Sequence, residues 1–165
     1  MKEKITEEIK KSVEVLRSGG VILYPTDTIW GLGCDATNEA AVKKVYDIKQ
    51  RTETKSMLVL IDSPAKLQAY VTEIPEMAWE LIELTTNALT IVYPGARNLA
   101  PNLIGDDQTI GIRVTEEPFS KKLCEMFRKP IVSTSANVSG TKSPAFFDEI
   151  AGEIIQAVDY VVNFR

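Results

Sequence analysis

The sequence VILYPTDTIWGLGCDATNEAAVKKVYDIKQRTETK, residues 21–55, sets the organisation of the whole chain. Its first four residues are apolar and follow Gly19-Gly20, a pattern that predicts a short buried strand. The strand should end at Pro25, which has no amide hydrogen to extend a ladder. Three oxygen-bearing side chains follow at residues 26–28, and then Gly31-Leu32-Gly33. We expect this permissive backbone to bring main-chain N–H groups close to a ligand at the end of the strand.

A helix predicted after Asn38 leads into three cations in seven residues, Lys49, Arg51 and Lys55. Cations at a helix C-terminus offset the macrodipole and usually stay in water. The alternative is a clamp for a polyphosphate, in which arginine grips a phosphate at two points and lysine acts as a point charge. The residues alone leave both interpretations open.

The bulk composition is that of one ordinary domain: 165 residues, 44% apolar and 25% charged. Lys plus Arg is 19 and Asp plus Glu is 23, so the net charge is −4, which argues against strong binding to nucleic acid. The N-terminal sequence MKEKITEEIKK is too charged for a signal peptide, and no apolar run reaches membrane-spanning length. We therefore expect a cytoplasmic protein with no membrane partner.

The chain contains no histidine. This excludes, within the chain, a Ser-His-Asp or Cys-His catalytic arrangement and a histidine metal site. Cys34 and Cys124 are too far apart in sequence for a zinc motif and make no disulfide framework. Any chemistry must rest on Lys, Arg, carboxylates, hydroxyls, backbone amides or a bound ion.

Apolar periodicity and chain breakers predict strands that alternate with helices. Helices are expected at residues 4–18, 38–48, 64–71, 75–83, 118–127 and 146–157, and strands at 21–24, 57–61, 88–93, 110–114, from 131 onward and at 160–162. Residues 94–109 have no clear period, which is typical of a functional or mobile segment. The alternation predicts a single α/β domain with a partly parallel sheet.

Arg113 lies in the predicted strand IGIRV, with apolar neighbours on both sides. A buried arginine needs an acidic partner, either a structural carboxylate or the carboxylate of a substrate. No carboxylate lies within the strand, and this favours the substrate.

The segment Ser133-Thr134-Ser135-Ala136-Asn137 follows another buried strand and offers three hydroxyls and an amide. Such turns also arise for local reasons, because Ser and Asn bond their own backbone. Asp27 is a base, a magnesium ligand or a cap of a helix or turn, and capping is the commonest of these. Cys34, Trp30 and Trp79 are expected to pack rather than react.

Three segments, in this order, resemble the YrdC-like family of threonylcarbamoyl-AMP synthases. They are GGVILYPTDTIWGLG at 19–33, the Lys49-x-Arg51 pair with Lys55 and the strand after it, and STSANVSG at 133–140, with IGIRV between the second and the third. The resemblance covers about residues 10–150. It implies a twisted mixed α/β sheet flanked by helices, with a concave, cationic cavity.

The resemblance also implies an activity. L-threonine, bicarbonate and ATP, with Mg2+ and no organic cofactor, would give threonylcarbamoyl-AMP and pyrophosphate. A separate tRNA-modifying threonylcarbamoyl transferase machinery would then place the group on adenosine 37 of tRNA, as the t6A modification.

The same resemblance assigns residues to the substrates. Thr28, Arg113 and Ser133 would bind threonine. Arg51, Lys55, Thr109, Ser135 and Ser143 would bind ATP, with Lys49 and Arg51 as the catalytic cations and no residue as a metal ligand.

The sequence departs from the family pattern at three places. Thr52 replaces a frequent proline, Ser56-Met57 replaces a frequent Pro-Leu, and Leu60 replaces a threonine-contacting histidine of some relatives. We expect one domain over residues 1–165, without the Ser/Thr-rich strand segment that continues in relatives. Two alternatives stay open, a YciO-like paralogue and an RNA- or nucleotide-binding module with weak RNA binding. The intact SAN segment favours the synthase over the paralogue, and the net charge of −4 argues against the RNA module.

Overall fold

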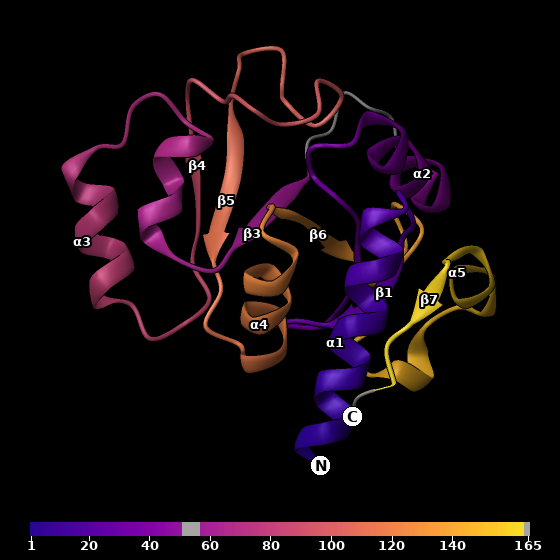
Figure 1. Cartoon of the computed structure of the whole chain (residues 1–165). Helices are drawn as coiled ribbons and strands as arrows, with labels where there is room; N and C mark the ends of the chain where they lie inside the picture. Colours follow the sequence, from indigo (N-terminus) through magenta and orange to yellow (C-terminus); the bar gives the residue numbers. More distant parts are fainter. Residues whose placement is uncertain (51–56, 164–165) are drawn as a thin grey trace.

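The computed structural model describes residues 1–50 and 57–163 of the chain. Within these residues, seven strands form one mixed sheet in the order β4-β5-β3-β6-β2-β1-β7 (Figure 1). The strands are β1 Ile22–Pro25, β2 Trp30–Gly33, β3 Leu58–Ile61, β4 Thr90–Tyr93, β5 Ile110–Val114, β6 Ile131–Ser135 and β7 Tyr160–Val161. The helices are α1 Lys2–Arg17, α2 Glu39–Lys49, α3 Glu76–Leu84, α4 Pro118–Phe127 and α5 Gly152–Ala157, with 3-10 helices η1 Pro64–Ala69 and η2 Phe147–Glu149.

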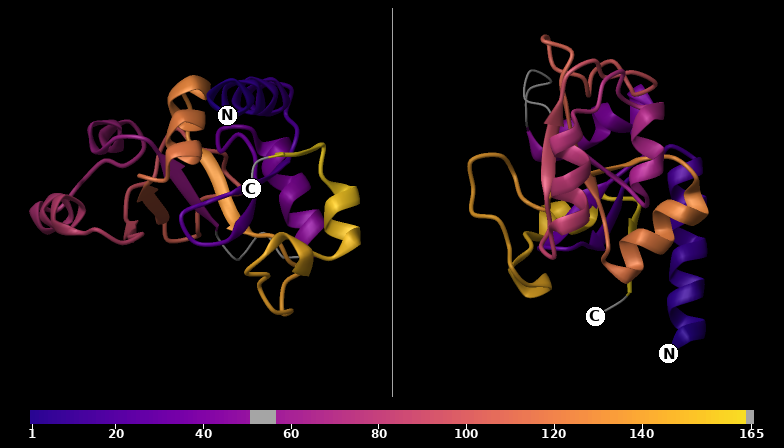
Figure 2. Two further views of the ribbon diagram at one scale, coloured as in Figure 1. Left: turned by 90° about the horizontal axis from the view of Figure 1, so that it is seen from below. Right: turned by 90° about the vertical axis from the view of Figure 1, so that its left-hand side faces the viewer.

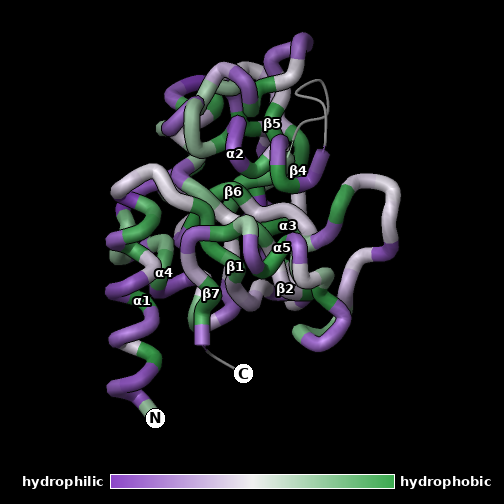
Figure 3. The backbone as a smooth tube through the Cα atoms, turned by 90° about the vertical axis from the view of Figure 1, so that its right-hand side faces the viewer, coloured by the Kyte–Doolittle hydropathy of each residue, from purple (hydrophilic) through white to green (hydrophobic). Residues whose placement is uncertain are grey.

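The two faces of the sheet pack against different helices. Helices α1 and α4 cover one face, where they meet Ile22, Leu60 and Ile131. The neighbouring strand residues, such as Leu23 and Val59, face the other way and pack with α2. This alternation follows from the two-residue period of a strand. In Figure 3, hydrophobic residues are concentrated along the central strands, whereas hydrophilic residues predominate along α1.

Strand pairing confirms the mixed α/β sheet that the sequence predicts. The pairs β1–β7 and β3–β5 are parallel, and the other four pairs are antiparallel. Strand β7 lies beside β1, and the Val21 N–H donates to Asp159 Oδ2 at 2.7 Å. Figure 2 shows this C-terminal part of the chain returning beside the N-terminal part.

Strand β2 is not predicted by the sequence pattern. It lies between β1 and β6, so its backbone is paired on both sides and its glycines do not bring amides to a ligand as expected. A Cβ on Gly33 would lie 2.6 Å from Cε1 of Tyr24 and 3.0 Å from the carbonyl oxygen of Val132. Glycine is required here because neighbouring atoms leave no room for a side chain.

Most other element boundaries match the prediction. Strand β5 and helix α4 have the predicted bounds. The expected helix at 146–157 is instead η2 followed by α5, because Ile150 and Ala151 have extended backbone. No helix in the described part of the chain is long and apolar enough to cross a membrane.

Candidate active site

One face of the sheet carries two of the residues expected to bind threonine. Leu60 of β3 pairs with both Arg113 of β5 and Ile131 of β6, and Leu58 pairs with Ser133. Directly paired residues point to the same face, and so do residues two apart in one strand. Arg113 and Ser133 therefore share a face, in the two strands that flank β3.

Arg113 is half-buried on this face. Its Nε donates to Thr90 Oγ1 at 3.1 Å, and the two residues are paired across β4 and β5. None of the ion pairs between described residues involves Arg113. A guanidinium has five N–H donors, so four remain for another acceptor. A structural carboxylate as its partner thus has no support within the described residues, and the substrate carboxylate stays the better interpretation.

Lys49, at the end of α2, is only 1% exposed. Its Nζ donates to the carbonyl oxygen of Ser135 at 2.6 Å and to that of Asn137 at 3.1 Å. It also lies 3.0 Å from Asn137 Oδ1 and 3.3 Å from Ser135 Oγ. The interpretation as a solvated cation is therefore wrong for Lys49. Its ammonium holds the turn that follows β6.

Further contacts fix the loop around this ammonium. Asn137 Nδ2 donates to the carbonyl oxygen of Thr141 at 2.7 Å, and Ser135 Oγ donates to Asn137 Oδ1. The Ser139 N–H donates to the carbonyl oxygen of Lys49 at 2.8 Å. Sequence reasoning assigned no role to Asn137, although the amide two residues after Ser135 was the available signal.

Thr28, the third residue expected to bind threonine, is exposed at the tip of the β1–β2 turn. Asp27 precedes it and is half-buried, with Oδ1 2.7 Å from Oγ1 of Thr115. Since Thr115 directly follows β5, this hydrogen bond places the turn that carries Thr28 against the end of the strand that carries Arg113. This contact joins Asp27 to another segment of the chain. It is therefore not the cap of a helix or turn that is the commonest role of such an aspartate.

The residues expected at ATP are less fully placed. Thr109 directly precedes β5, and its Oγ1 donates to Asp107 Oδ1 at 2.6 Å, a bond that lowers the pKa of this exposed carboxyl. Ser143 is exposed in the loop after β6. Arg51 and Lys55 lie outside the described residues.

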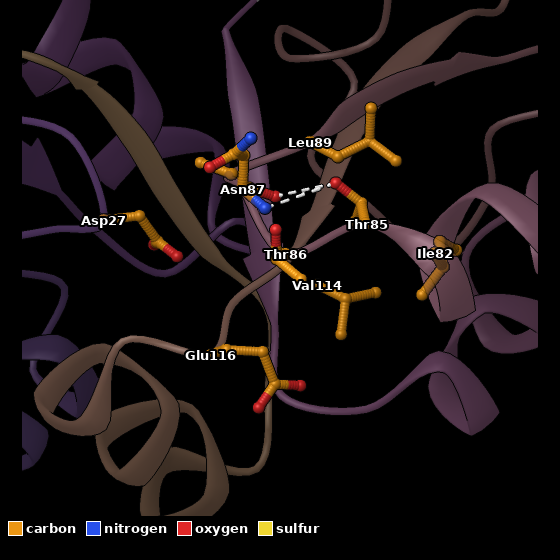
Figure 4. A pocket seen from close by; sticks show the side chains of 9 residues that line it. Asp27, Ile82, Thr85, Thr86, Asn87, Leu89, Val114 and Glu116 are labelled. Atoms are coloured by element: carbon orange, nitrogen blue, oxygen red, sulfur yellow. Dashed lines mark hydrogen bonds between the residues drawn. The ribbon is translucent and has the colours of Figure 1, made fainter.

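Two pockets flank the β1–β2 turn. One, of about 140 Å³, is lined by Asp27, Ile82, Thr85, Thr86, Asn87, Ala88, Leu89, Val114 and Glu116 (Figure 4). The other, of about 360 Å³, is lined by Pro25, Thr26, Thr28, Ile29, Trp30, Ala145, Phe146 and Phe147. Arg113 lines neither pocket. The β1–β2 turn contributes Asp27 to the first pocket and Thr28 to the second, and it is bonded to Thr115, which follows the strand of Arg113.

The cysteines of the structure are not activated nucleophiles. Cys34 and Cys124 are buried, and burial raises the pKa of both thiols above its ordinary value. The thiolate is the reactive form, so a raised pKa leaves both groups inert near neutral pH. Trp30 packs edge-on against Phe147, with 5.1 Å between the ring centroids. The structure agrees with the expectation that Cys34 and Trp30 pack rather than react.

Comparison with known proteins finds a family model and several proteins that are similar to this chain. The Sua5/YciO/YrdC family model, which carries the description "Telomere recombination", matches residues 14–165. A protein of Pseudoalteromonas translucida named threonylcarbamoyl-AMP synthase is 38% identical over 158 residues, which cover 94% of this chain and 84% of that protein. A protein of Vibrio cholerae with the same name is 34% identical over 162 residues, with coverage of 96% and 86%.

Solved structures of two other proteins have a fold similar to that of this chain. The crystal structure of P. abyssi Sua5 complexed with L-threonine has a TM-score of 0.87 and 29% sequence identity, and the match covers 93% of this chain. The chain spans about half the length of that protein, 45%. The structure of E. coli YciO has a TM-score of 0.81 and 28% identity, with coverage of 93% of this chain and 75% of that chain.

Proposed function

This chain belongs to the Sua5/YciO/YrdC family, and we propose that it is a threonylcarbamoyl-AMP synthase. Its substrates would be L-threonine, bicarbonate and ATP, the last with Mg2+ on its phosphates. Its products would be threonylcarbamoyl-AMP and pyrophosphate. A separate transferase machinery in the cytoplasm would pass the threonylcarbamoyl group to adenosine 37 of tRNA as t6A.

The observation that carries the proposal is the guanidinium of Arg113. It lies half-buried on an inner strand, and none of the described ion pairs gives it a carboxylate. An amino-acid carboxylate matches the planar fork of arginine and would form two parallel hydrogen bonds with it. Ser133, on the same face, would supply a hydroxyl to the same substrate.

Lys49 would act on the nucleotide side through the loop that it holds. Its buried ammonium is bonded to the backbone and side chains of Ser135 and Asn137, so the position of the Ser135 hydroxyl depends on it. We therefore place Lys49 in the catalytic machinery as the residue that orders this loop and adds positive charge beneath the phosphates. Arg51, Lys55, Thr109 and Ser143 remain expected ATP contacts.

The reaction needs no side-chain nucleophile. The amine of threonine takes up carbon dioxide derived from bicarbonate and loses a proton, which gives a carbamate. A carbamate oxygen attacks the α-phosphorus of ATP, and the bond from that phosphorus to the bridging oxygen breaks as pyrophosphate leaves. The protein's task is to hold three anionic groups close together, with the attacking and leaving oxygens in line, and to stabilise the charge that develops on the phosphates. A site made of Arg, Lys and hydroxyls suits this task.

The test is pyrophosphate release from ATP, with L-threonine and bicarbonate omitted in turn. We expect release only when all three substrates and Mg2+ are present, together with a product that has the mass of threonylcarbamoyl-AMP. Release without threonine would indicate a different acceptor, and the absence of release with all substrates would contradict the proposed function.

A further inference from the structure

The tip of the β1–β2 turn consists of Asp27 and Thr28, and the turn is closed by its own hydrogen bonds. The N–H and Oγ1 of Thr26 both donate to the carbonyl oxygen of Ile29, at 3.2 and 2.5 Å. The Thr28 N–H lies 3.4 Å from Thr26 Oγ1. These bonds fix the shape of the turn. The base of the turn is held in the sheet by the pairing of β1 with β2.

The tip is held in addition by contacts to the segment after β5. Thr115 is fully buried, and its N–H donates to the carbonyl oxygen of Ile61 at 2.9 Å, which extends the β3–β5 ladder by one residue. Its side chain therefore leaves the sheet on the same face as Arg113, two residues earlier. From there Thr115 Oγ1 donates to Asp27 Oδ1 at 2.7 Å. The buried Ser120 of α4 adds a second bond, from its Oγ to the carbonyl oxygen of Pro25 at 3.1 Å.

We propose that Asp27 is a positioning residue for the amino-acid substrate, which acts through Thr115 to hold Thr28 over the face of the sheet that carries Arg113. The inference rests on the proposed function, because it concerns the threonine side of that site. The hydroxyl of Thr115 donates, so an oxygen acceptor at residue 27 is what this bond requires. With the turn fixed, Thr28 and Arg113 present a preformed pair to the substrate, and less binding free energy is spent on ordering the turn.

The competing roles of Asp27 are those of a general base and a magnesium ligand. Both need the negative charge of the carboxylate, whereas the positioning role needs only a hydrogen-bond acceptor. Asp27 also lines the 140 Å³ pocket together with Glu116, and an acidic pair there would bind a cation in the competing role (Figure 4). Variants that separate charge from acceptor therefore distinguish these roles.

Three variants make this separation. Asp27→Asn keeps an oxygen acceptor and removes the charge, and Asp27→Ala removes both. Thr115→Val changes the shape little and removes the donor to Asp27, together with the acceptor of the Glu117 N–H at 3.3 Å. We expect Thr115→Val and Asp27→Ala to raise the KM for L-threonine about tenfold, with the KM for ATP and kcat within about twofold of wild type. Asp27→Asn should stay close to wild type. The double variant Asp27→Ala/Thr115→Val should be no worse than either single one.

A matched control is Ser12→Ala in α1, which removes another buried hydrogen bond, from Ser12 Oγ to the carbonyl oxygen of Glu8 at 2.7 Å. It should leave every KM unchanged, because Ser12 lies in α1, far along the chain from the turn and from β5. Loss of kcat in Asp27→Asn, with Thr115→Val unchanged, would assign Asp27 to base or metal chemistry and overturn the inference. Lower thermal stability with an unchanged threonine KM in Thr115→Val and Asp27→Ala would overturn it as well.

The affinity for L-threonine, measured by calorimetry without ATP, separates this inference from the proposed function. If the wild type turns over and Thr115→Val binds threonine equally well, the inference fails and the proposed function stands. If the wild type binds threonine without turning over, the proposed function fails, and the change of the dissociation constant in the variants still tests the role of Asp27. A wild-type chain that neither binds threonine nor turns over overturns both.

Discussion

The half-buried guanidinium of Arg113 donates one hydrogen bond to Thr90 and forms none of the described ion pairs. Replacing Arg113 therefore tests whether it binds the substrate carboxylate. Arg113→Ala should raise the KM for L-threonine about 100-fold or more, because the substrate carboxylate would lose its only proposed cationic partner. Arg113→Lys should recover part of this loss, since a point charge replaces the planar fork. The KM for ATP should change little in both variants, as measured by pyrophosphate release.

The control for this prediction is Arg17→Ala, which removes an exposed arginine at the end of α1. Its steady-state constants should match those of the wild type. An Arg113→Ala variant with an unchanged threonine KM would remove the observation on which the proposed function rests.

Lys49 gives a second prediction at the scale of single residues. Lys49→Met should lower the free energy of unfolding by about 2–4 kcal/mol, because the oxygens of Ser135 and Asn137 would stay buried without their donor. Activity should be lost even at temperatures where the variant is folded, since the loop after β6 would no longer be ordered. Urea denaturation and pyrophosphate release measure the two effects.

Lys43→Met is the matched change on the same helix. Lys43 forms an exposed ion pair with Asp47 at 3.1 Å, so its removal should change the free energy of unfolding by less than about 1 kcal/mol. Equal effects of the two lysine variants would contradict the structural role given to Lys49.

At this scale the sequence predicted the types of the site residues better than their surroundings. Arg113 was predicted correctly as an arginine on an inner strand. The burial of Lys49 was not predictable, because its acceptors, Ser135 and Asn137, lie 86 and 88 residues further along the chain. Cations at the end of a helix give the same local sequence pattern whether they are buried or exposed to solvent.

At the scale of elements, the glycines of β2 decide how closely the strands approach. Gly33→Ala should lower the free energy of unfolding by about 2–3 kcal/mol, because the new methyl group would overlap the ring of Tyr24 and approach the backbone of Val132. Urea denaturation measures the loss.

Gly152→Ala provides the comparison. Gly152 is the first residue of α5, and no atom lies within 4 Å of the place where its Cβ would be. This variant should be as stable as the wild type or more stable, by up to about 1 kcal/mol, because alanine favours a helix. A loss of stability in Gly152→Ala as large as in Gly33→Ala would show that the effect does not come from strand packing.

Elements with a clear period and clear breakers were predicted well, and those defined by distant contacts were not. Strand β5 is an apolar run between polar turns, and α4 begins at a proline, so both had local signals. Strand β2 is WGLG, a sequence of low strand propensity, and it is a strand because β1 and β6 pair with it on both sides. The sequence shows the glycines without showing the neighbours that require them.

At the scale of the whole molecule, buried thiol and phenol groups make the stability of the fold depend on pH in the alkaline range. Burial raises the pKa of Cys34, Cys124 and Tyr24 above their ordinary values. The folded chain therefore keeps these protons at a pH where the unfolded chain has released them. The contribution of the two thiols to stability is complete below their unfolded pKa, near 9, and falls progressively as the pH rises from there toward the raised pKa of the folded state.

We expect the free energy of unfolding in urea to fall steadily above about pH 9 for this reason. The direct measurement is the rate at which iodoacetamide alkylates the thiols. The native protein should react little at about pH 9.5, whereas the chain in concentrated urea should react with a pH dependence near the ordinary thiol pKa. Rapid alkylation of Cys34 and Cys124 in the native protein at that pH would contradict their burial.

The parallel pairing of β7 with β1 has a consequence for the synthesis of the chain. Ile22 pairs with Tyr160, so the outer edge of β1 stays uncovered until residues near 160 have been made. At typical rates of translation the interval is on the order of 10–30 s. During this time an apolar strand with unpaired backbone groups is available to other nascent chains. The pairing of β7 with β1 thus also covers a strand edge that is open to aggregation while the chain is being made.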